Sequence, residues 1–323
     1  MNEFEVIRRI SSALPARPPE VIVPIGDDCA VVRLGGTDWV IAADMLVYGH
    51  HFLDWATPEE VGYKAVAVNV SDVAAMGSEP RFILCSCGAA DPETALRCME
   101  GVLEAAGEFG VYPLGGDTTG AAALTVDVTI MGAMPEGVEP VLRTGARVGD
   151  LLAVTGELGA SAAGFLALEA GRRGEAERLA RRHLRPEPRV DAGRAAAAAG
   201  VRAMIDLSDG LASDARHLCA GSGVGCRIEL DRLPVAGDTR VFAESEGRDA
   251  EELAATGGED YELLVAAPES ALREMSGSCA VPVTVVGEVT EGAEVEFLRG
   301  GEVRGSLSGW DHFPAGRAEG VPD

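Results

Sequence analysis

The chain has 323 residues, enough for two domains at ~150 residues each. Its 27 lysines and arginines against 52 aspartates and glutamates leave a formal charge of −25, opposite in sign to the surface of a protein that binds nucleic acid or anionic membranes. No apolar run approaches the ~18 residues of a membrane span, and the acidic N-terminus does not resemble a secretory signal. We therefore expect a cytoplasmic protein that meets phosphates through metal ions.

The first half of the chain combines short strands with two helices. Strands are expected at 21–25, 39–43 and 124–131, and helices at 57–77 and 93–109. Thr57 and Glu60 form a capping box at the start of the first helix, and Gly77 is a natural stop. The run 115–120, Gly-Gly-Asp-Thr-Thr-Gly, is interpreted as a glycine-rich turn that offers backbone N–H groups to a phosphate.

The composition changes near residue 145, which predicts an N-terminal domain over 1–145 and a C-terminal domain over 146–323. The second part is rich in alanine, glycine and leucine. Its expected helices are 160–170, 190–199 and 210–219, and its expected strands are 151–155, 227–230, 261–266 and 283–286. In the run 205–210, Ile-Asp-Leu-Ser-Asp-Gly, a strand ends and a helix begins, so Ser208 is expected to cap that helix. The fold class is therefore α/β in two domains.

Cysteine and lysine usage exclude several kinds of site. The seven cysteines include no Cys-x-x-Cys pair, which disfavours zinc and favours free thiols in a reducing compartment. Lys64 is the only lysine and does not lie in a Gly-Lys-Ser/Thr loop, so a Walker-type phosphate loop is excluded.

Seven aspartates stand directly after, or inside, apolar segments. They are Asp27, Asp28, Asp44, Asp72, Asp117, Asp206 and Asp209. Each alone is explained by a helix cap or a turn, but the set suits hard divalent cations such as Mg²⁺, which take carboxylate ligands. Phosphoryl transfer is the reaction that most needs such ions.

Asp72 is the clearest single case. Its helix is apolar on every side and should be buried, so the carboxylate needs a cation or an ion pair. Asn69 lies three residues earlier on the same side and can share a ligand or a water molecule. A metal ion is favoured, and an ion pair with an arginine is the alternative.

Other polar groups are less decisive. The turn 257–262, Gly-Gly-Glu-Asp-Tyr-Glu, carries adjacent acids. His50 and His51 are either substrate contacts or surface residues, and Trp310 either packs on its own domain or stacks on a flat heteroaromatic ring. His183, His217 and His312 are interpreted as ordinary helix or loop residues.

The chain resembles the thiamine-monophosphate kinase family over about residues 4–313. The resemblance rests on motifs in the family's order, at 26–28, 44–47, 51–52, 64–72, 115–119, 206–211, 257–262 and 309–313. It implies the ATP-binding superfamily of aminoimidazole ribonucleotide synthetase, selenide-water dikinase and a hydrogenase maturation factor. In that superfamily the N-terminal domains of a homodimer share a β-barrel, and a C-terminal α/β domain covers the nucleotide.

The resemblance also implies a set of site residues. The metal ligands are Asp28, Asp44, Asp72, Asp117, Asp206 and Asp209, with Ala42 and Ala43 able to contribute only backbone carbonyls. The ATP contacts are Gly116, Asp117, Arg143 and Ser208. The contacts to thiamine monophosphate are His51, Glu259 and Trp310. Four positions depart from the family's usual pattern: hydroxyl residues are replaced by Ala42 and Ala43, an arginine by Gly120, and an acidic residue by Tyr48.

The expected reaction is in-line transfer of the ATP γ-phosphoryl group to the phosphate of thiamine monophosphate, with Asp72, Asp117 and Asp209 as catalytic residues and Mg²⁺ ions screening the two anions. The expected partners are these small molecules and a second copy of the chain, with no nucleic acid and no membrane. Lys64 either contacts a phosphate or pairs with an internal acid. Two alternatives stay open: a synthetase-like ligase of the same superfamily, and a non-catalytic nucleotide-binding protein.

Overall fold

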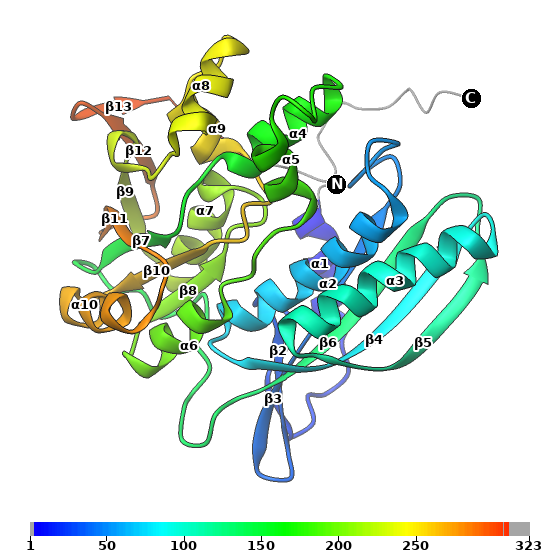
Figure 1. Ribbon diagram of the computed structural model, residues 1–323. Helices are drawn as coiled ribbons and strands as arrows, with labels where there is room; N and C mark the ends of the chain where they lie inside the picture. Colours follow the sequence, from blue (N-terminus) through cyan, green and yellow to red (C-terminus); the bar gives the residue numbers. More distant parts are fainter. Residues whose placement is uncertain (1–2, 306, 310–323) are drawn as a thin grey trace.

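The computed structural model describes residues 3–305 and 307–309, which fold around two β-sheets joined by a central helix (Figure 1). The N-terminal sheet is mixed, because β4 and β5 are parallel and its other pairs are antiparallel. Its strands, in spatial order, are β1 (Val21–Val23), β2 (Ala30–Leu34), β3 (Thr37–Val47), β6 (Thr125–Ala133), β4 (Glu79–Ala89) and β5 (Tyr112–Gly120). The helices of this half are α1 (Glu3–Ser12), α2 (Pro58–Ala75) and α3 (Pro92–Phe109), of which α2 and α3 cover one face of the sheet (Figure 1).

The C-terminal sheet has helices on both faces. Its strand order is β13 (Glu302–Arg304), β12 (Val295–Arg299), β9 (Gly225–Glu229), β11 (Val283–Thr290), β7 (Leu151–Thr155), β10 (Leu263–Ala267) and β8 (Ala203–Asp206). The helices are α4 (Ala160–Glu169), α5 (Glu177–Leu184), α6 (Val190–Ala198), α7 (Leu211–Ser222), α8 (Gly237–Ser245), α9 (Ala250–Thr256) and α10 (Glu269–Ser278), with a 3₁₀ turn at Leu230–Arg232. One apolar core joins the sheet to α7, and another joins its opposite face to α6 and α10.

Helix α2 is the element that connects the two halves. It contacts β3, β6 and α3 on one side and β8, α5 and α6 on the other. From Val61 to Ala75 every residue is buried except Asp72. The expected capping box is present, because Thr57 accepts from the backbone of Glu60 and the Glu60 carboxylate accepts from the backbone of Thr57. The prediction that this helix is buried and carries a carboxylate, Asp72, in its apolar surroundings is confirmed.

Two local predictions are wrong. The glycine-rich run at 115–120 is part of strand β5 rather than a turn, and Gly116 allows close pairing because a Cβ there would lie 1.6 Å from the Cys85 carbonyl oxygen. Ser208 does not cap α7, since that helix begins at Leu211 with Gly210 at its N-cap and no side-chain cap hydrogen bond.

The long strand β4 and several C-terminal elements have no counterpart in the sequence prediction, whereas most other predicted elements lie within a few residues of their observed bounds. Among the described residues, no helix combines the length and the apolar character needed to cross a bilayer.

Candidate active site

Three aspartates predicted as metal ligands come together where the two halves of the molecule meet. Asp28 lies in the loop before β2, Asp72 on α2 and Asp206 at the end of β8. Each offers a carboxylate oxygen, and these oxygens all lie within 4.8 Å of one another. Residues separated by more than 170 positions in the chain thus form a tricarboxylate cluster.

Asp44 stands beside the cluster on β3. Its backbone N–H donates to the Asn69 Oδ1 atom at 3.1 Å, and its charge raises the pKa values of both Asp72 and Asp206. Asn69 also donates to the Ala65 carbonyl at 2.9 Å. In the described structure, therefore, Asn69 positions the Asp44 strand against α2.

Burial raises the pKa values of all three carboxyl groups, and repulsion from neighbouring carboxylates adds to the shift at Asp72 and Asp206. Burial is the largest cause for all three, and it raises the pKa of Asp206 to about 8 although Ser71 donates to that carboxylate at 2.6 Å. The pKa of Asp72 is raised well above its usual value by burial and then by Asp44, Asp206 and Asp28. Raised pKa values at neighbouring buried carboxyl groups mean that the nearby positive charge is too small to stabilise their ionised forms.

Arg143 supplies one counter-charge: it forms ion pairs with Asp28 and Asp27, and its charge also opposes the raised pKa of Asp72 without offsetting it. Its Nη2 donates to Asp28 Oδ1 at 2.7 Å, and its backbone N–H donates to Asp27 at 3.2 Å. The other oxygen of Asp28, Oδ2, is buried with no hydrogen-bond partner among the described residues. Within that part of the chain Asp72 has no ion pair with an arginine, so the alternative explanation for Asp72 is not what the structure shows. One guanidinium against three or four carboxylates leaves room for a cation, and this donor set fits Mg²⁺.

A second group, Asp209, Asp214 and His217, offers ligand atoms that also lie within 4.8 Å of one another. Only Asp209 was predicted. Asp214 is 2% exposed, and burial raises its pKa well above its usual value; burial also lowers the pKa of His217 to about 4, so that its imidazole is neutral. The i, i+3 spacing of Asp214 and His217 on α7 was the signal in the sequence that could have identified them.

Asp117 is not brought to the cluster within one chain. The register pairs Asp44 with Val128, Val128 with Cys85, and Cys85 with Gly116, so β5 lies three strand spacings, roughly 14 Å, from β3. Side chains alternate between faces, which places Asp117 with Ser86 and Asp127 on the face opposite α2. Both Gly116 and Asp117 are exposed.

Ala42 and Ala43 are held in β3, opposite Ile130 and Thr129 of β6. Ala43 and Asp44 are exposed residues at the rim of the sheet, next to the cluster. The departures Tyr48 and Gly120 are exposed as well, and the Tyr48 hydroxyl donates to Asp54 at 2.8 Å.

Two of the residues predicted to contact the acceptor, His51 and Glu259, are described by the structure. Glu259 and His51 are neighbours, because the charge of His51 contributes to a lowered pKa at Glu259. The His51 Nδ1 atom accepts from the Val47 backbone at 3.0 Å, which fixes the ring at the end of β3. Lys64 forms an ion pair with Glu259 at 2.9 Å, so the internal-acid interpretation of Lys64 is correct. Trp310 lies outside the described residues.

The Glu259 loop is tied directly to the segment that carries Asp206 and Ser208. The backbone N–H of Glu259 donates to the Ser208 carbonyl at 2.7 Å, and that of Tyr261 donates to the Leu207 carbonyl at 3.0 Å. These bonds fix the Glu259 loop against the segment that follows β8.

Comparisons with known proteins agree with this geometry. Residues 26–134 match the model of the AIR synthase related protein, N-terminal domain, and residues 147–299 match that of its C-terminal domain. Thiamine-monophosphate kinase of Mycobacterium tuberculosis (strain ATCC 25618 / H37Rv) is 38% identical over 320 residues, covering 97% of this chain and 92% of that protein. The Escherichia coli (strain K12) enzyme of the same name is 37% identical, covering 97% and 98%. A solved structure of AaThiL complexed with AMPPCP and TMP superposes with a TM-score of 0.84 at 33% identity, covering 97% of each chain.

Proposed function

The chain belongs to the thiamine-monophosphate kinase family, and on that premise we propose that it transfers the γ-phosphoryl group of ATP to thiamine monophosphate, giving thiamine diphosphate. The observation that carries the proposal is the tricarboxylate cluster of Asp28, Asp72 and Asp206, served by the single guanidinium of Arg143. The binding of AMPPCP, an ATP analogue, and TMP by the relative AaThiL supports ATP as the co-substrate.

We assign the metal sites to the residues whose chemistry fits them. Asp28, Asp44, Asp72 and Asp206 would hold Mg²⁺ at the cluster, and Asp209 would hold it at the adjacent group on the α7 side. Ala42 and Ala43 offer only backbone carbonyls. A Mg²⁺ ion held by these residues would supply positive charge to screen the phosphates during transfer. The orphaned Asp28 Oδ2 atom is the structural feature that supports this assignment.

The remaining roles follow from position. Arg143 and Ser208 border the cluster and would orient the ATP phosphates, while His51 and Glu259 would hold the acceptor on the opposite side, together with Trp310. Asp72 and Asp209 face the reacting phosphates. The acceptor phosphate is already ionised near neutral pH, since the second pKa of a phosphate monoester is about 6, so none of these side chains has to act as a strong base. Their work is to position and to screen two anions.

Gly116 and Asp117 belong to a homodimer in this proposal. The sheet face that carries Asp117 also presents Met45, Leu84 and Tyr112, which are 49%, 46% and 68% exposed. The edge strand β5 is exposed along nearly its whole length. A second copy that completes a barrel across this face would cover the apolar side chains and pair the open edge. We propose that Gly116 and Asp117 reach ATP and metal in this assembly.

We also propose a domain boundary near residue 145 and a cytoplasmic location. All seven cysteines are free thiols, as expected in a reducing compartment.

The test of the proposal is conversion of thiamine monophosphate by the purified protein. With ATP and Mg²⁺, thiamine diphosphate and ADP should form in equal amounts, and omission of Mg²⁺ should abolish both products. Thiamine replaces thiamine monophosphate as the control acceptor, because it lacks the attacking phosphate. Tight ATP binding without any diphosphate product would contradict the assignment.

A further inference from the structure

We infer that Lys64 and His183, with Ser161 behind them, are positioning residues for the acceptor: they clamp the Glu259 carboxylate in one ionised orientation and thereby set the affinity for thiamine monophosphate. The inference deepens the proposed function and rests on it. It begins from a buried group of polar side chains that the phosphoryl-transfer chemistry itself does not require.

Lys64 and His183, which we call the clamp, each lie against a different oxygen of the Glu259 carboxylate. Lys64 Nζ lies 2.9 Å from Glu259 Oε1, and His183 Nδ1 lies 3.3 Å from Glu259 Oε2. The two clamping side chains are each 3% exposed, whereas the Glu259 side chain is 27% exposed. Its carboxylate is therefore held from the protein side and remains open on the other.

The protonation of the clamp follows from its contacts. Lys64 Nζ also lies 3.4 Å from His183 Nε2, and because an ammonium group only donates, Nε2 must accept. Burial, followed by the charge of Lys64, lowers the pKa of His183 to about 3, so the ring is neutral and carries its proton on Nδ1. That N–H faces Ser161 Oγ at 3.0 Å and Glu259 Oε2. Glu259 thus has a charged donor on Oε1, with the His183–Ser161 pair beside Oε2, and Lys64 lowers the pKa of Glu259 against the opposing effect of burial.

The backbone of this loop indicates that the orientation of Glu259 matters. Glu259 and Tyr261 have φ angles of 63° and 52°, the only positive values among non-glycine residues in the described chain. Such conformations cost of order 1 kcal/mol each and persist only where the surroundings enforce them.

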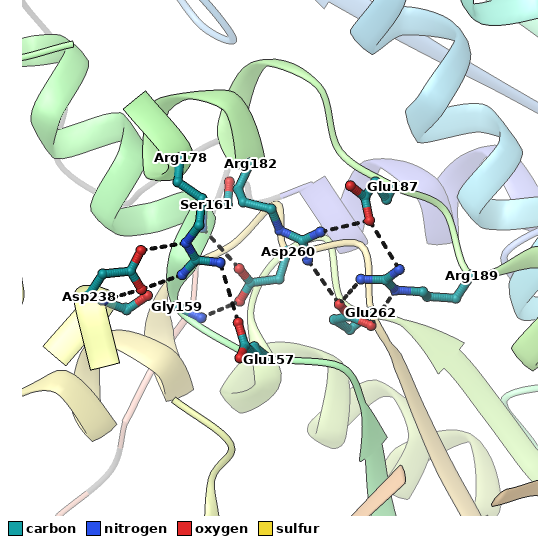
Figure 2. Close-up of polar contacts among 11 residues, drawn as sticks. Glu157, Gly159, Ser161, Arg178, Arg182, Glu187, Arg189, Asp238, Asp260 and Glu262 are labelled. Carbon is teal, nitrogen blue, oxygen red and sulfur yellow. Dashed lines mark hydrogen bonds and ion pairs between the residues drawn. The ribbon is translucent and has the colours of Figure 1, made fainter. Parts of the chain in front are cut away.

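The two neighbouring acids of this loop, Asp260 and Glu262, are themselves held by polar contacts, which Figure 2 shows. Asp260 accepts from the backbone N–H groups of Gly159 and Ser161 at 2.7 and 3.1 Å. Glu262 is fully buried and accepts from Arg182 at 3.0 Å and from Arg189. Three anchors, at positions 259, 260 and 262, hold a strained loop in which Glu259 is the one partly exposed acid.

The chemistry of the acceptor matches such a carboxylate. Thiamine monophosphate carries an exocyclic amino donor on its pyrimidine and a cationic thiazolium ring, and both favour an ionised, oriented carboxylate over a neutral acid. Without Lys64, Glu259 would lose its charged donor and could rotate or take up a proton. The clamp is thus a specificity device for the acceptor, with no direct role for ATP.

A double-mutant cycle read by direct binding tests the inference. Lys64→Met should weaken binding of thiamine monophosphate by roughly 10- to 100-fold, the usual effect of a lost charged hydrogen bond, and leave the affinity for a non-hydrolysable ATP analogue within about twofold. Because Lys64 acts through Glu259, Lys64→Met added to Glu259→Gln should cause no further loss. Arg202→Met is the control, since Arg202 forms an ion pair with the buried Asp150 at 2.5 Å and neither residue is assigned to the acceptor.

Each other outcome overturns the inference. Multiplying losses in the double variant would mean that Lys64 contacts the ligand itself, for example its phosphate. If Lys64→Met weakened the binding of thiamine monophosphate and of the ATP analogue equally, the clamp would be only a structural ion pair. The same conclusion would follow if Arg202→Met weakened the binding of thiamine monophosphate selectively. If Lys64→Met does not fold, His183→Gln replaces it in the same cycle, because that variant removes the Nδ1 donor and keeps Lys64. Wild-type protein that binds ATP but forms no thiamine diphosphate would refute the proposed function, a result distinct from all of these.

Discussion

Replacing Asp206 by asparagine should stabilise the metal-free protein, although it removes a residue assigned to the active site. In the folded chain the pKa of Asp206 is raised to about 8 from 3.8, chiefly by burial and then by Asp28. Near pH 7 the folded state therefore holds a proton that the unfolded state has released. Because pH 7 lies about three units above the unfolded-state pKa of 3.8, keeping this proton in the folded state lowers the free energy of unfolding by roughly 4 kcal/mol. Asparagine is neutral in both states and can still accept the hydrogen bond from Ser71, so up to roughly 4 kcal/mol should be regained.

The sign of the pH dependence follows from the same pair of values. A group whose folded pKa is raised contributes stability that is fully present below the unfolded value of 3.8 and is lost as the pH rises through about 8. Wild-type protein in EDTA should therefore become less stable between about pH 5 and pH 8, and Asp206→Asn should flatten this slope. Urea unfolding at several pH values measures both effects.

Magnesium should narrow the difference in stability between the wild-type protein and Asp206→Asn. A ligand at 100 times its dissociation constant adds about 2.7 kcal/mol to a protein that binds it only when folded, and Asp206→Asn should lose most of this gain. Asp150→Asn is the control, since this carboxylate is equally buried but paired with Arg202, and its loss should destabilise by roughly 3 kcal/mol. A metal-free wild type whose stability does not change with pH, or an Asp206→Asn variant that is less stable in EDTA, would refute the reasoning.

Three further outcomes are expected. Asp72→Asn should keep the fold, judged by circular dichroism, and abolish thiamine diphosphate formation; near-normal turnover at low Mg²⁺ would contradict its role. Gly116→Ala should destabilise the protein by roughly 2 kcal/mol or more in urea unfolding, because its Cβ would lie 1.6 Å from the Cys85 carbonyl oxygen; wild-type stability would show that β5 relaxes easily. Leu84→Asp, on the exposed sheet face, should shift sedimentation from dimer to monomer, and an unchanged dimer would place the interface elsewhere.

The sequence was most informative where local rules decide the structure. The capping box at Thr57 and the unbroken apolar pattern around Asp72 predicted α2 to within a few residues, and a buried carboxylate on such a helix correctly indicated a special environment. The gathering of Asp28, Asp72 and Asp206 followed only from the resemblance, because no spacing rule brings together residues on a loop, a helix and a distant strand.

The errors arise where tertiary contacts override local preference. A run rich in glycine usually forms a turn, but at 115–120 it forms a strand because Gly116 must approach the β4 backbone closely. His183 was interpreted as an ordinary residue, since nothing in its own helix shows that Lys64 and Glu259, 119 and 76 positions away, converge on it. Contacts of this range are set by how α2 and the C-terminal sheet pack together.

The distribution of unfavourable features around α2 supports a binding site better than any single residue does. Carboxylates that repel one another lie beside this helix at Asp72. Eight residues earlier on the helix, Lys64 holds the strained loop around Glu259, on the side that we assign to the acceptor. The repulsion between carboxylates and the strain in the loop would each destabilise the ligand-free protein. Among the described residues nothing removes either of them completely. Cations relieve the first, and a cationic, amino-bearing acceptor makes use of the second. On the proposed function, one buried helix would fix the separation between the two substrates, which is the geometric requirement of in-line transfer.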